Sequence, residues 1–250
     1  MQKVLFSCAT LAGTGKKGVL KKDENGYYTM PIGGLNVFNS VGEFYTYEEA
    51  KELFSASSIF MRRVKAGALK GEYGHPKPLP GQSYDSFAER VLTIEEKNIC
   101  THFSEVWLDF DSVRDNTGKK VIAIMAKLAP SGPMGAAIAR SLENPQEDVC
   151  YSIRSFTKDT FIGGIKHRAL AEIVTWDYVN EPGINFARKY NSPALESLHE
   201  QTFTRNDLVR AIKHMDSGMG MESAKMTGVS LFKSLGWSFN ENEVPRYLKW

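Results

Sequence analysis

The chain of 250 residues has few cysteines and no long apolar run. Its three cysteines, Cys8, Cys100 and Cys150, are widely spaced and odd in number, which argues against a disulfide framework and against a paired-cysteine metal site. No stretch approaches the ~20 apolar residues that span a membrane, and the apolar run before Cys8 is too short for a signal peptide. We therefore expect reduced thiols, a cytosolic setting and no membrane partner.

The chain also lacks an excess of charge of one sign. Its formal net charge is only +2 and it has no long basic run, so we expect no nucleic-acid partner. The segment GTGKKG partly matches a phosphate-binding loop, but the glycine four residues before Gly15 is missing and Lys17 stands where Ser or Thr is required. We interpret it as a solvated turn, and no cofactor is expected.

Hydrophobic patterning predicts a mixed chain in which strand signals dominate up to residue 179 and helix signals follow residue 204. In residues 99–110, Val106, Leu108 and Phe110 alternate with other residues as a half-buried strand requires. A strand over residues 27–36 is expected to be interrupted at its paired glycines. Further strands are predicted at residues 1–13, 121–128, 149–156 and 170–179, with a Gly163-Gly164 turn before the last.

Capping residues predict where helices begin. Thr46 and Glu49 have the spacing of a capping box, which predicts a helix that buries Leu53 and Phe54. Pro133 is expected as the first helical residue ahead of MGAAIARSLE.

Two regions are expected to be loops. Residues 77–81 contain two prolines, which cannot donate to a ladder, and should form an exposed loop beside His75. Residues 181–203 are polar and rich in turn formers. Beyond them, TRNDLVRAIKHM and ESAKMTGVSLFKSLGW are predicted to form two amphipathic helices.

A histidine and a serine in distant segments carry the catalytic signal. His75 lies in AGALKGEYGHP, between a glycine and a proline that restrict its backbone, and Ser152 lies in the strand VCYSIRSFTKD. A hydroxyl nucleophile needs a general base, and histidine titrates near working pH. Because side chains alternate along a strand, Ser152 shares a face with Arg154, whereas Ser155 faces the other way. From the pattern alone, the favoured interpretations are structural: a small hydrogen-bonded serine on a core strand and a surface histidine in a proline-rich loop.

The order and spacing of several segments resemble the prohead (capsid-maturation) proteases of tailed bacteriophages, distant relatives of the herpesvirus assembly proteases. The resemblance covers roughly residues 18–192. It runs through GVLKKDENGYYTMPIGGLNVFN, EEAKELF, GALKGEYGHP, ICTHFSEVWLDFD, PSGPMGAAIARSLE, CYSIRSF and IVTWDYVNEPGINFA. It implies an α+β fold built on a mostly antiparallel β-barrel surrounded by helices, as in the herpesvirus assemblins.

The chain is accordingly divided into a protease domain over residues 1–192 and a linker with a helical C-terminal segment over residues 193–250. The C-terminal segment lies beyond the resemblance. Three interpretations of this segment stay open: a tail docked on the core, an assembly-targeting element and a removable propeptide.

The resemblance implies a serine endopeptidase that cleaves scaffold and capsid precursors inside the immature head, in the host cytoplasm. Ser152 would be the nucleophile and His75 the general base. Related viral proteases are active as dimers, so a homodimer is an expectation. Two other classes stay open: a non-enzymatic head-assembly protein that retains the fold, and a hydrolase of small esters, which the absence of a G-x-S-x-G elbow disfavours.

The remaining site residues have competing candidates. Asp177, in IVTWDYV, falls on the strand after the serine strand, where the resemblance places the third residue, although the herpesvirus relatives have a histidine there. His102, in CTHFSE, is the alternative. Arg154 and Arg168 are candidates for stabilising the oxyanion, with backbone amides as the other source.

The resemblance also implies self-cleavage. Proteases of this family cut after a glutamate preceded two positions earlier by a small or aliphatic residue. Glu196, in Ala-Leu-Glu, and Glu222, in Gly-Met-Glu, fit this pattern within stretches expected to be loops or linkers. A similar triplet ending at Glu143 lies in the expected core, where folding should protect it.

Overall fold

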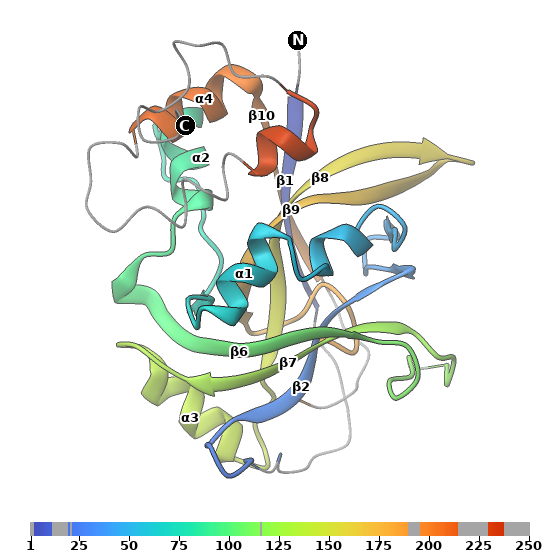
Figure 1. Ribbon diagram of the computed structural model, residues 1–250, viewed down its shortest axis with the longest axis vertical. Helices are drawn as coiled ribbons and strands as arrows, with labels where there is room; N and C mark the ends of the chain where they lie inside the picture. Colours follow the sequence, from blue (N-terminus) through green and yellow to red (C-terminus); the bar gives the residue numbers. More distant parts are fainter. Residues whose placement is uncertain are drawn as a thin grey trace.

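The framework of the protein is a pair of sheets, seen in a computed structural model that describes residues 3–11, 20, 22–115, 117–189, 196–214 and 230–237 (Figure 1). The six-stranded sheet has the spatial order β10 (Glu196–Thr204), β1 (Lys3–Leu11), β8 (Cys150–Ile162), β9 (Ile165–Val179), β4 (Phe44–Tyr45) and β3 (Val37–Phe38). The four-stranded sheet has the order β2 (Tyr28–Leu35), β7 (Ile122–Pro130), β6 (Ile99–Asp109) and β5 (Lys70–Glu72). Hydrogen-bonded neighbours are antiparallel except β4 and β9.

The two sheets pack on each other without closing into a barrel. On one side β5 runs on towards β9, and the two are joined by a parallel bridge between Tyr73 and Tyr178. On the other side β2 lies against β8, but no ladder joins these strands in the part of the chain that the structure describes. The predicted α+β class with antiparallel sheets is confirmed, whereas the predicted barrel is not closed.

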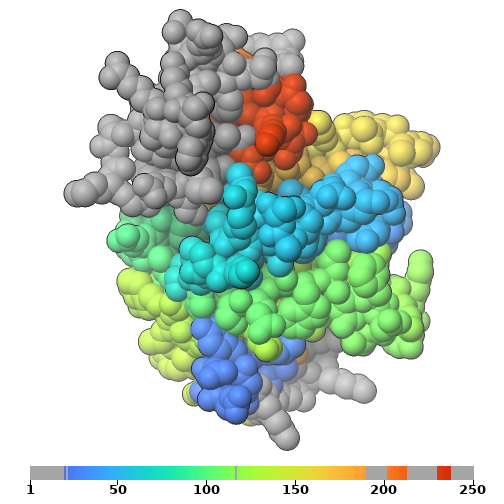
Figure 2. Space-filling model, viewed as in Figure 1, coloured from blue at the N-terminus to red at the C-terminus, as the bar shows by residue number. Residues whose placement is uncertain are grey.

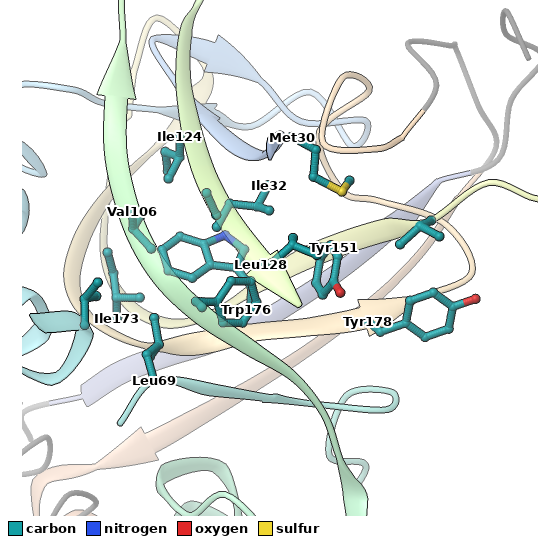
Figure 3. Close-up of a cluster of buried hydrophobic side chains, with 14 of the residues drawn as sticks. Met30, Ile32, Leu69, Val106, Ile124, Leu128, Tyr151, Ile173, Trp176 and Tyr178 are labelled. Atoms are coloured by element: carbon teal, nitrogen blue, oxygen red, sulfur yellow. The ribbon is translucent and has the colours of Figure 1, made fainter. Parts of the chain in front are cut away.

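The main core lies between the sheets and is centred on Trp176 of β9 (Figure 3). Tyr151, Trp176 and Tyr178 point into it because residues two apart on a strand share a face. Ile32 and Val106 reach it from the opposite sheet. The alternate face of β8 and β9 is thereby left to Ser152 and its neighbours.

A second core covers that alternate face. It is built by α2 (Tyr84–Leu92), α4 (Arg205–His214) and residues 230–237, which pack their apolar sides on β8 and β9. The members include Phe87, Val91, Phe156, Val174, Phe203, Leu208, Ile212, Leu231, Phe232 and Leu235. The residues after 192 that the structure describes therefore pack directly on the sheet that carries Ser152.

Two further helices cover the main core from outside. In α1 (Ile59–Lys65), Ser58 caps the helix by accepting a hydrogen bond from the Met61 amide, and Phe60 and Val64 are buried. Figure 2 shows α1 and the segment before it as a continuous band across the front of the molecule. The helix α3 (Gly135–Glu143) buries Ile138 and Leu142. None of the helices in the described ranges is long and apolar enough to span a membrane.

The predicted capping box does not form. Residues 51–54 make only a short 3₁₀ turn, and the capping residue before it, Ala50, has no side-chain bond. The reason is that the Thr46 hydroxyl and amide both donate to the carbonyl oxygen of Arg168, so Thr46 is held by β9 and cannot cap a helix. Leu53 and Phe54 nevertheless pack against the main core.

Other predicted boundaries also shift. The region 181–203 was expected to be a loop throughout, but residues from Glu196 onward form β10, which pairs along its length with β1. Such a pairing depends on a partner at the other end of the chain and leaves little trace in local sequence. The helix after Pro133 begins at Gly135, and the strands predicted at residues 99–110 and 121–128 are confirmed as β6 and β7 within two residues.

Gly71 sets how closely β5 approaches β9. A Cβ at this position would lie 2.3 Å from the carbonyl oxygen of Trp176 and 3.0 Å from the Phe103 ring. We expect Gly71→Ala to lower the free energy of unfolding by about 1–3 kcal/mol, because backbone and ring must both give way. Chemical denaturation measures this.

The matched control for Gly71→Ala is Gly135→Ala, where the nearest atoms lie at an ordinary 3.4 Å. Since Gly135 lies in a helix, alanine there should be neutral or stabilising. Equal stability of Gly71→Ala and the wild type would show that the contact with β9 is not as close as the structure has it.

Candidate active site

Ser152 and Asp177 lie directly opposite each other on neighbouring strands. They are Cα partners in the β8–β9 ladder, and both are buried. Directly paired residues point to the same face with Cβ atoms about 4.5–5.5 Å apart. Ser155, the other serine of the motif, instead pairs with Ile173 beyond a register shift, away from Asp177.

His75 is brought to the same place from the other sheet. After β5 the chain follows the end of β9, where the amide of Gly74 donates to the carbonyl oxygen of Tyr178 at 2.8 Å. Gly74 has φ +84°, a left-handed conformation that glycine adopts at little cost, and this turn directs the next residue inward. The Nδ1 atom of His75 then lies 2.8 Å from Oδ2 of Asp177.

The second nitrogen of the imidazole, Nε2, is buried, and no hydrogen-bond partner reaches it among the residues that the structure describes. The side chain of His75 is only 6% exposed. A histidine held by a carboxylate through Nδ1 keeps its other nitrogen available as a base. The structure therefore brings together three of the residues selected from the sequence, His75, Ser152 and Asp177.

The Asp177 carboxylate accepts four hydrogen bonds. The amide of Glu72 and Nη2 of Arg154 donate to Oδ1 at 3.1 and 2.7 Å, while Nε of Arg154 and His75 bind Oδ2, each at 2.8 Å. Burial alone would raise the pKa of Asp177, but the Arg154 guanidinium and His75 outweigh it and lower this pKa to about 2. Asp177 is thus fixed in position and ionised at neutral pH.

The contacts of Arg154 do not fit the role predicted for it as an oxyanion donor. Its guanidinium is fully buried, and each of its nitrogens is already engaged: Nε and Nη2 by Asp177, and Nη1 by the carbonyl oxygens of Val91 and Thr93. Nη2 also lies 3.2 Å from the Glu72 carboxylate. The alternation rule placed Arg154 on the correct face, but its partner is the aspartate rather than a substrate.

Arg168 lies elsewhere in the sheet. It is nine residues before Asp177 on β9, about 30 Å along the strand, and it is buried against the carboxylate of Glu43. The pKa of Glu43 illustrates the strength of this pairing: burial would raise it, yet Arg168 and Lys166 lower it to about 2. Arg168 therefore does not reach Ser152, contrary to its candidacy for the oxyanion.

His102 is bound to a different part of the protein. It lies on β6 opposite Lys70 and Ala129, and its Nδ1 is 2.8 Å from the hydroxyl of Tyr27. Burial lowers the pKa of His102. Among the described contacts, Asp177 bonds to His75, whereas His102 does not take part in this contact. The alternative third residue therefore does not orient His75 in this structure.

Two charged residues of the site were missed from the sequence. Glu72 is fully buried, and its carboxylate contacts Arg154 and a second arginine, Arg90 of α2. Glu72 stands inside the motif GEYGHP, three residues before His75, and a carboxylate there was a signal that could have been read. Arg90 had no such signal, since it lies in an ordinary amphipathic helix.

A pocket adjoins Ser152 where β2 lies against β8. Its wall is mostly apolar, with Asn39 as the polar side chain besides serine and tyrosine. The lining residues are Ile32, Gly33, Gly34, Asn39, Tyr45, Ile124, Tyr151, Ser152, Ile153, Leu170, Gly183, Ile184 and Ala187. The absence of side chains at the two glycines leaves room for the protein's own residues, since a Cβ on Gly34 would lie 2.4 Å from the Phe186 ring and one on Gly33 would lie 3.2 Å from Ile124.

The predicted self-cleavage positions have different outcomes. Glu196 is the first residue of β10 and is the Cα partner of Leu11, so it does not lie in a free linker. Glu222 lies outside the described residues.

Comparison with known proteins defines the class. Residues 6–232 match the model of the Peptidase S80 family. The buried pair of His75 and Asp177 and the neighbouring Ser152 therefore lie within the part of the chain that matches a peptidase family. The chain belongs to the Peptidase S80 family.

A particular relative is the capsid maturation protease of Pseudomonas phage phiKZ, to which the chain is 38% identical over 247 residues. The match covers 95% of this chain and 90% of the relative. Among solved structures, the capsid assembly protease of bacteriophage T4 matches with a TM-score of 0.41 and 13% identity, over 78% of this chain and 98% of that one. The resemblance to phage maturation proteases found in the sequence is confirmed.

Proposed function

We propose that this peptidase is a serine endopeptidase in which Ser152 is the nucleophile, His75 the general base and Asp177 the residue that orients the base. The observation that carries the proposal is the 2.8 Å bond from His75 Nδ1 to Asp177, with Nε2 buried and Ser152 paired to Asp177 across the ladder. This is the arrangement of roles that defines a serine protease irrespective of fold.

In the proposed reaction, Nε2 of His75 takes the proton of the Ser152 hydroxyl as its oxygen attacks the carbonyl carbon of the scissile bond. The imidazolium that forms is stabilised by Asp177, which stays ionised because Arg154 lowers its pKa. His75 then returns the proton to the leaving amine, and a water molecule releases the acyl group from Ser152 by the same two steps. Since both arginine candidates are bound to carboxylates, backbone amides are the remaining proposed donors to the oxyanion.

We further propose that the substrates are capsid and scaffold precursors of a phage, cleaved inside the immature head in the host cell. The similarity to the phiKZ protein supports this, because that protein is a capsid maturation protease and matches nearly the whole chain. Cleavage after glutamate in small-x-Glu sequences and a homodimeric active form belong to the same proposal.

Covalent labelling tests the nucleophile. Purified protein treated with a fluorophosphonate should gain one adduct by intact mass, and peptide mapping should place it on Ser152. A chain that stays unlabelled while folded would support the alternative, a head-assembly protein without activity. Labelling at Ser155 instead would show that the nucleophile is misassigned.

Self-trimming gives a further prediction. On prolonged incubation the wild type should shorten itself to end at Glu196 or Glu222, whereas Ser152→Ala should keep its full length. Cleavage at Glu196 should be the slower, because β10 must first unpair from β1, and its product should lose stability since Phe203, Leu208 and Ile212 leave the second core. Intact mass over time and thermal unfolding of the products measure both effects. A wild type that cleaves a peptide yet still ends at Trp250 would refute self-trimming.

A further inference from the structure

A buried charge network extends from the proposed active site to helix α2. Starting at His75, it passes through Asp177 and Arg154 to Glu72, and from Glu72 to Arg90. Asp177, Arg154 and Glu72 are fully buried, and the side chain of Arg90 is 19% exposed. The inference that follows rests on the proposed function, since it concerns how its base is held.

Arg154 lies between two carboxylates that compete for it. It binds Asp177 through Nε and Nη2 at 2.8 and 2.7 Å, and the same Nη2 is 3.2 Å from Glu72. If Glu72 had no other cation, its full charge would draw Arg154 away from Asp177, because attraction between charges is strong in a buried site. The position of Asp177 under His75 therefore depends on what else satisfies Glu72.

Arg90 supplies that second cation. Its Nη1 donates to Oε1 of Glu72 at 3.0 Å and its Nη2 binds Oε2, a two-pronged contact. The amide of Glu95 adds a third bond to Oε1 at 2.6 Å. The two carboxylates and two guanidinium groups of the network then balance, and the more exposed carboxylate of Glu95, 3.3 Å from Nε of Arg90, is itself paired with Lys97 at 3.3 Å.

The same helix end also holds Arg154. The carbonyl oxygens of Val91 and Thr93, at the C-terminal end of α2, accept from its Nη1. Helix α2 is in turn packed on α4 through the second core. The charged side chains in contact with the imidazole or its aspartate are Asp177 on β9 and Arg154 on β8, with Glu72 on β5 behind Arg154 and Arg90 and Glu95 beyond Glu72. Cys100 on β6 lies within electrostatic range of Asp177, and Arg63 on α1 within that of Arg154.

We infer that Glu72 and Arg90 are positioning residues of the active site, which keep Arg154 on Asp177 and hold the net charge beside His75 at zero. Neither residue touches the reacting atoms. Their effect is transmitted through Arg154 to Asp177, and from Asp177 to the imidazole that it orients.

The test measures the rate of Ser152 labelling by a fluorophosphonate as a function of pH. Arg90→Gln leaves an uncompensated negative charge, which stabilises the imidazolium, so the acid limb of the profile should move to higher pH. Glu72→Gln removes a negative charge and should move the limb to lower pH. Each shift should be roughly 0.5–1 pH unit, smaller than the 1–3 units caused by a charge in direct contact. The double variant is again neutral, so its limb should return towards that of the wild type.

Arg210→Gln is the matched control. Arg210 lies on α4 and pairs with Asp85 of α2 and with Asp207, so its loss removes one arginine from the same helical layer outside the network. The acid limb of its profile should lie within about 0.2 pH unit of the wild-type limb, because salt screens an exposed charge. If Arg90→Gln unfolds, Arg90→Lys serves in its place, because lysine keeps the positive charge without the two-pronged contact. The acid limb of the Arg90→Lys profile should coincide with that of the wild type.

The possible outcomes separate the two claims. Absence of labelling in the wild type overturns the proposed nucleophile. A second outcome is that the wild type is labelled, but Arg90→Gln and Glu72→Gln lower the labelling rate by the same factor at every pH, without opposite shifts. This outcome overturns the positioning role and leaves Ser152 as the nucleophile.

Discussion

Replacing the Ser152 hydroxyl by hydrogen is expected to reduce peptide-bond cleavage by about 10⁴-fold or more while the protein stays folded. The nucleophile is lost, and the residual rate over water then comes from substrate binding and the oxyanion donors alone. The side chain is small and buried on β8, so alanine fits its place. The measurement is kcat/KM on a peptide with the sequence of residues 190–201 of the chain itself, with circular dichroism to confirm folding.

Ser155→Ala is the control for this substitution. Ser155 is buried on the same strand, but it pairs with Ile173 rather than Asp177. We expect at most a few-fold change in its kcat/KM. Near-normal proteolysis by purified Ser152→Ala would remove this residue from the mechanism.

The second large effect is expected for Asp177→Asn. The amide favours the wrong tautomer of His75 and cannot stabilise the imidazolium, so activity should fall by about 10³–10⁴-fold. It also leaves the buried Arg154 facing only one carboxylate, which should lower the free energy of unfolding by about 3–5 kcal/mol. Activity must therefore be measured well below the melting temperature, together with a denaturation curve for each variant.

His102→Ala tests the competing assignment. His102 lies on β6 of the four-stranded sheet and is bound to the hydroxyl of Tyr27, so its loss should cost a few-fold in activity at most. If His102→Ala abolishes cleavage and Asp177→Asn does not, the orienting residue is a second histidine and the geometry around Asp177 has another purpose.

The sequence predicted the parts of this site that depend on local patterns and on the order of motifs, but not the parts that depend on long-range packing. His75, Ser152 and Asp177 were selected from the sequence through the resemblance to the phage proteases, and the structure places His75 and Ser152 next to Asp177. The partner of Arg154 was not found, since alternation assigns a side chain to a face but does not say which charge lies opposite it. Arg90 was beyond reach because only the packing of α2 brings it to Glu72.

The fold shows the same division. Strands with strong alternation, such as β6, were predicted nearly to the residue. The helix start at Thr46 was wrong because a distant carbonyl, that of Arg168, takes the hydroxyl that local spacing assigned to a cap. β10 was missed because its partner, β1, lies at the opposite end of the chain. Long-range pairing therefore limited the prediction wherever it overrode a local preference.

The place of β1 between β8 and β10 has a consequence for how the molecule is made. Roughly 190 residues separate the start of β1 from the start of β10, and at about 5–20 residues per second the ribosome needs roughly 10–40 s to cross that interval. The first strand is synthesised long before either neighbour exists, and its outer edge finds a partner only after β10 has been made. A growing chain thus passes this whole interval with the six-stranded sheet unfinished, and the sheet is completed only after β10 has emerged.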